Sequence, residues 1–150
     1  MRWFSLCLSF LVCSSFLSDR VLINELYYDH PGRDDGHEFV EIINLSPAAL
    51  GLGGCRLEFH DGSSVGWVTI WHAQPGDTIV GMGLFVVGGE DLYPPPDVIT
   101  ELGLQNGPDA VRLVDGGVVL DLLGYGALES PGYFEGRSAP DVPQGSSLSR

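Results

Sequence analysis

Closely spaced turn residues divide this chain into short apolar or alternating runs, and this pattern constrains the fold more than any other feature. The 150 residues include 21 glycines and 10 prolines. Short runs with a period of two, separated by Gly, Pro, Asp and Asn, are typical of the strands of all-β sandwiches and barrels. Beyond residue 20, no stretch has the three-to-four-residue periodicity of an amphipathic helix. The sequence therefore predicts an all-β protein, and its length fits one domain with an adequate core.

Strands are predicted over eight ranges: 21–28, 38–44, 55–60, 65–71, 78–80, 83–88, 110–115 and 118–123. Gly116 and Gly117 join the last two ranges, and Asp61 and Gly62 follow the third. Both dipeptides are typical of β-hairpin turns. From residue 129 the chain is rich in Pro, Gly and Ser, and we expect this segment to wrap the surface.

Residues 1–18 are predicted to be a signal peptide, which leaves 19–150 as the folded domain. Arg2 precedes an uncharged, largely apolar run that is shorter than the ~20 residues of a membrane-spanning helix. An uncleaved anchor and a misassigned start are the alternatives. Cleavage would leave Cys55 as the one cysteine, too few for a disulfide or a zinc cluster. We therefore expect a protein secreted or exported to the cell envelope, with Cys55 acting as a small apolar residue.

The charge is strongly acidic, with 20 carboxylates against 7 basic residues and a net charge of −13. Such a charge repels phosphate backbones and anionic lipids, so nucleic acid and membrane surfaces are poor partners. It fits cations, basic protein surfaces, or simply solubility.

Several motifs resemble those of the lamin-tail domain. They are I-N-E at 23–25 and E-F-V-E-I-I-N at 38–44, together with the segments 49–57, 104–113 and 121–126. The resemblance implies an immunoglobulin-like β-sandwich of the exported bacterial kind, a non-catalytic module that binds or tethers a protein or cell-surface partner. The long helical rod of nuclear lamins is missing from this sequence, so a nuclear role is not implied. Bacterial relatives continue past a segment like 145–150 into a final strand. The resemblance thus implies either a fragment of a longer protein or a sheet without that edge strand.

The acidic loop between the first two predicted strands has the highest density of ligand-type side chains. Carboxylate oxygens suit Ca²⁺, and the candidate ligands are Asp29, Asp34, Asp35 and Glu38. The loop does not fit the EF-hand register, and a solvated turn is the simpler interpretation. Zinc bound by His30 and His37 lacks convincing third and fourth ligands.

Glu38 and Glu41 are three apart on a predicted strand and should point to opposite faces, so they are not a same-face catalytic pair. We expect Glu25 to approach one of them across the sheet, with Arg56 or Arg112 neutralising the carboxylate.

Two further motifs have structural explanations. The G-x-S-x-G pattern at 62–66 precedes a predicted strand, whereas a nucleophile elbow precedes a helix. Trp67 and Trp71 are four apart and are predicted to share one strand face, in the core more often than in a ligand groove.

The leading prediction is a binding module whose contact surfaces are loops, including 29–38 and 90–97. The alternatives are a small metal-dependent hydrolase that uses the acidic loop, and an accessory domain of a larger secreted enzyme.

Overall fold

The computed structural model describes residue 17 and residues 20–150, and the proposed signal peptide lies almost wholly outside these residues. The described residues form loops and eleven strands: β1 (Val21–Tyr27), β2 (Phe39–Asn44), β3 (Leu50–Gly51), β4 (Cys55–Asp61), β5 (Val68–His72), β6 (Thr78–Ile79), β7 (Leu84–Gly88), β8 (Val98–Ile99), β9 (Asp109–Asp115), β10 (Val118–Tyr125) and β11 (Leu148–Ser149). The prediction of an all-β fold is confirmed. This part of the chain has no helix that is long and apolar enough to cross a membrane.

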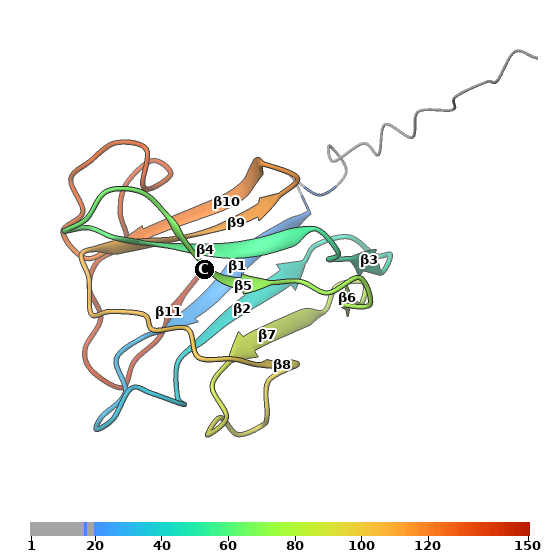
Figure 1. The fold of residues 1–150 in the computed structure, drawn as a ribbon, viewed down its shortest axis with the longest axis horizontal. Coiled ribbons are helices and arrows are strands. Elements are labelled where there is room, and N and C mark those ends of the chain that lie inside the picture. Colours follow the sequence, from blue (N-terminus) through green and yellow to red (C-terminus); the bar gives the residue numbers. More distant parts are fainter. Residues whose placement is uncertain (1–16, 18–19) are drawn as a thin grey trace, which may run out of the picture.

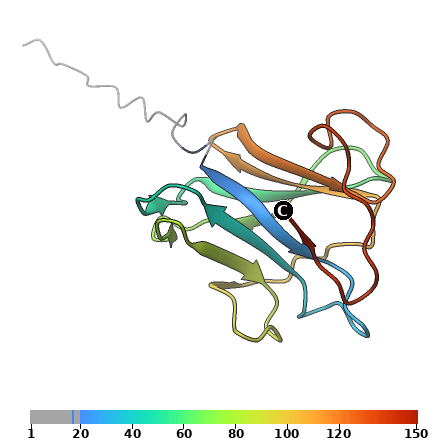
Figure 2. The ribbon, with the colours of Figure 1, turned by 180° about the vertical axis from the view of Figure 1, so that it is seen from behind.

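Two sheets face each other across one core (Figure 1). One sheet has five strands in the order β11-β1-β2-β7-β8, and the other has four in the order β10-β9-β4-β5. Strands β3 and β6 form a small separate pair. All strand pairs are antiparallel except β7 with β8. Figure 2 shows β11 beside β1 at the edge of the larger sheet.

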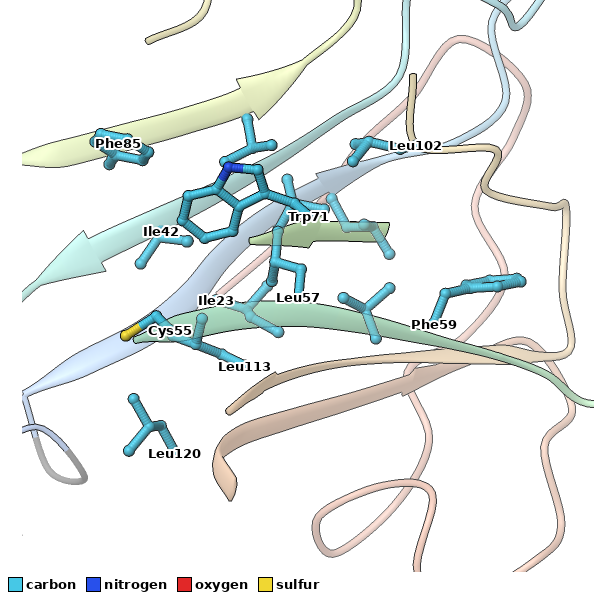
Figure 3. Close-up of a cluster of buried hydrophobic side chains, with 14 of the residues drawn as sticks. Ile23, Ile42, Cys55, Leu57, Phe59, Trp71, Phe85, Leu102, Leu113 and Leu120 are labelled. Atoms are coloured by element: carbon cyan, nitrogen blue, oxygen red, sulfur yellow. The ribbon is translucent and has the colours of Figure 1, made fainter. Parts of the chain in front are cut away.

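The period-two pattern of the longer strands builds the core. In β2, Val40 and Ile42 are buried, whereas Phe39, Glu41 and Ile43 face outward. The other strands contribute in the same way, and their apolar side chains interdigitate between the sheets (Figure 3). Such alternation is what one buried face of a sheet requires.

Cys55 starts β4 and is fully buried with a free thiol. Burial, and secondarily the charge of Asp115, raise the pKa of the thiol to about 12. The side chain therefore stays neutral and packs as a small apolar residue, as the sequence predicted.

The two tryptophans lie on opposite faces of their sheet, so the prediction of a shared face is wrong. Trp71 is only 6% exposed and packs on Phe85 in the core, with ring centroids 5.9 Å apart. Trp67 lies on the outer face, where the Arg112 guanidinium is 4.1 Å from its ring centroid. The register between β4 and β5 shifts at Ile70, and this bulge reverses the alternation between the two rings.

The sequence did not predict β3, β8 or β11, each only two residues long. The segment from residue 129 wraps the surface, as expected: it covers part of the four-stranded sheet and then supplies β11 to the five-stranded sheet. Tyr133 stacks on His60 with ring centroids 3.7 Å apart, and Ala139 forms an isolated bridge to Tyr125.

Candidate functional site

A groove lined by aromatic side chains opens on the outer face of the five-stranded sheet. It consists of two adjoining hollows of about 330 and 270 Å³, which share Phe39, Leu92 and Tyr93. The other lining side chains include Tyr27, His30 and His37, together with the carboxylates of Glu25, Glu41 and Asp91. We refer to this feature as the aromatic groove.

Strand register places the first aromatic pair in the aromatic groove. Tyr27 ends β1, Phe39 begins β2, and the two residues are directly paired across the ladder. Both side chains therefore leave the sheet on its outer face, where the rings stack with centroids 5.6 Å apart and planes 19° apart. Cross-strand aromatic pairs of this kind stabilise a sheet and give it a rigid apolar surface.

The histidines of the acidic loop extend this surface. The His30 and His37 rings stack with centroids 3.8 Å apart, and the His30 and Tyr27 rings form a T-shaped pair with centroids 6.2 Å apart. The two imidazoles contact each other face to face. Four rings from β1, β2 and the loop between them are thus contiguous.

The aromatic groove lies between the two loops that the sequence indicated as contact surfaces, and the backbone joins these loops. Asp91 donates its N–H to the Gly36 carbonyl and Gly89 donates to the Glu38 carbonyl, each at 2.9 Å. A Cβ at position 89 would lie 2.2 Å from the Gly36 backbone, so only glycine permits this close approach.

Tyr93 is the most accessible member of the aromatic groove. Its side chain is 96% exposed on the loop 89–97, next to three consecutive prolines. An exposed aromatic ring has no packing role in its own domain, and aromatic residues are enriched at binding sites. Sequence reasoning named the loop but missed Tyr93. An aromatic residue beside a proline run was the signal available.

The four predicted calcium ligands have four different partners. Asp29 accepts from the Gln144 amide at 3.0 Å, Asp34 accepts from the His30 N–H at 2.9 Å, and the exposed Asp35 pairs with Arg33 at 3.4 Å. Glu38 instead turns inward, where it accepts the Leu104 N–H at 3.0 Å. Across residues 20–150 the structure gathers no group of three or more His, Cys, Asp or Glu residues able to hold a metal ion. Calcium binding and a solvated turn were the two interpretations of this loop, and the separate partners of the four carboxylates are those of a solvated turn.

Glu38, which directly precedes β2, and Glu41 within β2 point to opposite sides of the sheet, as the sequence predicted. Glu38 is 4% exposed, and burial, partly offset by backbone N–H donors, raises its pKa to about 7. Glu41 lies on the outer face and accepts a hydrogen bond from the Asn24 amide at 2.6 Å.

The expected pairing of these carboxylates with arginine is wrong. Arg56 and Arg112 both bind Glu58 on the four-stranded sheet, because these three side chains share its outer face. The five-stranded sheet therefore presents its acidic groups without these cations.

The G-x-S-x-G segment forms the connection between β4 and β5. The Ser64 hydroxyl donates to the Asp61 carbonyl at 2.9 Å, as in a turn. A strand follows, as the sequence predicted, and not the helix of a nucleophile elbow.

No protein-family model and no curated protein matches the chain. The lamin-tail resemblance therefore remains an expectation from the sequence motifs.

Proposed function

We propose that this protein is an exported, non-catalytic module with a lamin-tail-like, immunoglobulin-like sandwich, and that it binds a protein partner, in solution or at a cell surface, through the aromatic groove. The proposal rests on one observation: the highly exposed Tyr93 ring and the stacked Tyr27 and Phe39 rings line the same groove. Exposed apolar surface gathered in this way marks interaction sites in soluble proteins.

The chemistry of the aromatic groove favours a partner segment that carries Arg or Lys. Aromatic faces attract cations through their quadrupole. The carboxylates of Glu25, Glu41 and Asp91 line the same groove, where they add charge–charge attraction. The net charge of −13 favours the approach of the same partners.

Isothermal titration with a synthetic peptide of alternating Gly and Arg tests the proposal. Glycine disfavours strand formation, so the peptide reports recognition of the cationic side chains. We expect Tyr93→Ala to weaken binding at least tenfold without any change in net charge. Val65→Ala is the matched control, because Val65 is 98% exposed on the remote β4–β5 connection. Equal binding by Tyr93→Ala and the unchanged protein would contradict the proposed function.

A further inference from the structure

Among residues 20–150, each of the two sheets ends in a strand that is paired on one side only, and these two strands border a second groove. Strand β5 is the last strand of the four-stranded sheet and β8 is the last of the five-stranded sheet (Figure 1). The hollow between them has a volume of about 460 Å³ and is lined by residues 69–72, Gln74 and residues 98–100. We refer to it as the edge groove. It shares no lining residue with the aromatic groove.

The backbone geometry points groups that have no strand partner toward the edge groove from both sides, although the His72 carbonyl accepts a long hydrogen bond of 3.4 Å from the Gln74 side-chain amide. Ala73 donates its N–H to the Cys55 carbonyl of β4, and Thr100 donates to the Gly88 carbonyl of β7. Because successive residues of a strand direct their backbone groups to opposite sides, the N–H and C=O of His72 and of Ile99 face away from these partners. Both edges therefore offer donors and acceptors to an added strand.

The floor of the edge groove is apolar. Trp71 lines the hollow and packs on Phe85 of the other sheet, and Figure 3 shows these two rings in the core between the sheets. Ile70 lies beside it half-buried, and Ile99 is 63% exposed at the opposite rim. An extended segment placed here would bury apolar side chains on one face while its backbone bonded to both strands.

The charge around the edge groove favours a cationic occupant over an acidic one. The residues that line the edge groove include no Arg or Lys, and Arg56, which lies opposite His72 in the ladder, is already paired with Glu58. Asp97 and Glu101 directly flank the β8 rim. A second copy of this chain would bring like charge to like charge, whereas a cationic segment would be attracted.

We infer that the edge groove binds an extended segment of another protein, in which apolar residues alternate with Arg or Lys, and that this segment joins β5 to β8 as an added strand. This interaction is separate from the proposed function of the aromatic groove, because it depends on backbone pairing at a different surface.

Three synthetic peptides test the inference by isothermal titration against the full chain. In the first, Val alternates with Arg and Thr. The second is the same peptide N-methylated at every other residue, which removes the backbone donors of one edge and keeps every side chain. The third carries Glu in place of Arg. We expect the first to bind and the other two to bind at least tenfold more weakly. Equal binding of the first two peptides, or no binding of the first, would overturn the inference.

Matched variants locate the binding. His72→Pro and Ile99→Pro each remove one N–H that faces the edge groove, and proline is tolerated on the unpaired edge of a strand. His72→Ala and Ile99→Ala retain the N–H and serve as their controls. We expect at least tenfold weaker binding for the proline variants relative to the alanine variants, with the melting temperature confirming that each is folded. All these titrations are made in the Tyr93→Ala background, where the aromatic groove binds Arg side chains weakly, so that the signal reports the edge groove.

Two results would assign the edge groove differently. If the folded proline variants bind as well as the alanine variants, the peptide does not add as a strand. If the protein is a dimer in sedimentation analysis and His72→Pro makes it monomeric, the occupant is a second copy of the chain. Either result would overturn the inference.

Discussion

The carboxylate of Asp121, in β10 of one sheet, accepts a hydrogen bond from the backbone N–H of Ile23, in β1 of the other, at 2.7 Å. In the described part of the chain, β11 pairs with β1 at Glu25 and Leu26, and Arg150 donates its N–H to the Asn24 carbonyl at 3.0 Å, so this ladder does not reach Ile23. Asp121 substitutes for a ladder partner there. Its second oxygen accepts from the Arg150 guanidinium at 2.8 Å. One buried carboxylate thus joins β1, β10 and the residue that follows β11.

Removal of this carboxylate should destabilise the fold. We expect Asp121→Ala to lower the free energy of unfolding by about 1–3 kcal/mol, because the buried Ile23 N–H would lose its acceptor. Asp121→Asn keeps a carbonyl oxygen at the same place and should cost less. Urea denaturation measures both variants. A loss as large for Asn as for Ala would mean that the backbone bond is not the main contribution.

Glu38 should make the protein less stable as the pH rises through neutrality. Its folded-state pKa of about 7 lies above the ordinary value of 4.5 for Glu, so the native state holds the proton more tightly than the unfolded chain does. The favourable contribution is complete below pH 4.5 and is lost as the pH rises through 7, a difference of roughly 3 kcal/mol. Glu38→Gln removes this titration and retains an acceptor for the Leu104 N–H.

Denaturant unfolding at pH 5 and pH 8 checks this prediction. The comparison is between the pH dependence of the two proteins, so a uniform effect of the substitution cancels. Parallel pH profiles for the unchanged protein and Glu38→Gln would show that another group is responsible.

The two tryptophans of the β5 region should respond differently to truncation. We expect Trp71→Ala to cost about 3–5 kcal/mol, because it leaves a cavity between the sheets. Trp67→Ala should cost less than about 2 kcal/mol, since it removes a half-buried ring and its contact with Arg112. Thermal and urea unfolding measure the difference. Equal losses would contradict the opposite-face placement.

Calcium should leave the stability of the domain unchanged. Asp29, Asp34, Asp35 and Glu38 have separate partners, and a bound ion would have to draw them together. We therefore expect the same melting temperature in EDTA and in millimolar Ca²⁺. A rise with Ca²⁺ that EDTA reverses would establish the acidic loop as a cation site.

The strands that the sequence predicted are those with long period-two patterns and clear turns, such as β2 with its alternating Val40, Glu41 and Ile42. Strand β8 is only two residues long, and its pairing with β7 depends on the path of the chain after β7. The residues of β8 themselves therefore gave no pattern from which the strand could be predicted. Trp67 was placed on the wrong face because a bulge at Ile70 reverses the alternation, and a bulge leaves little trace in composition.

The aromatic groove was predictable only in part. Both bordering loops were identified from their charged and proline-rich composition. The pairing of Tyr27 with Phe39 depends on register, and the position of Tyr93 depends on the backbone bonds between Gly36 and Asp91. These are contacts between distant segments, and the periodicity of one segment does not specify them.

The most direct test of the account is a map of amide chemical-shift changes when the Gly-Arg peptide is titrated into the labelled protein. We expect the largest changes at residues that line the aromatic groove, with Tyr27, Phe39 and Tyr93 among them. Small changes scattered over the acidic surface, or changes centred on another face, would contradict the proposal that this groove binds the partner.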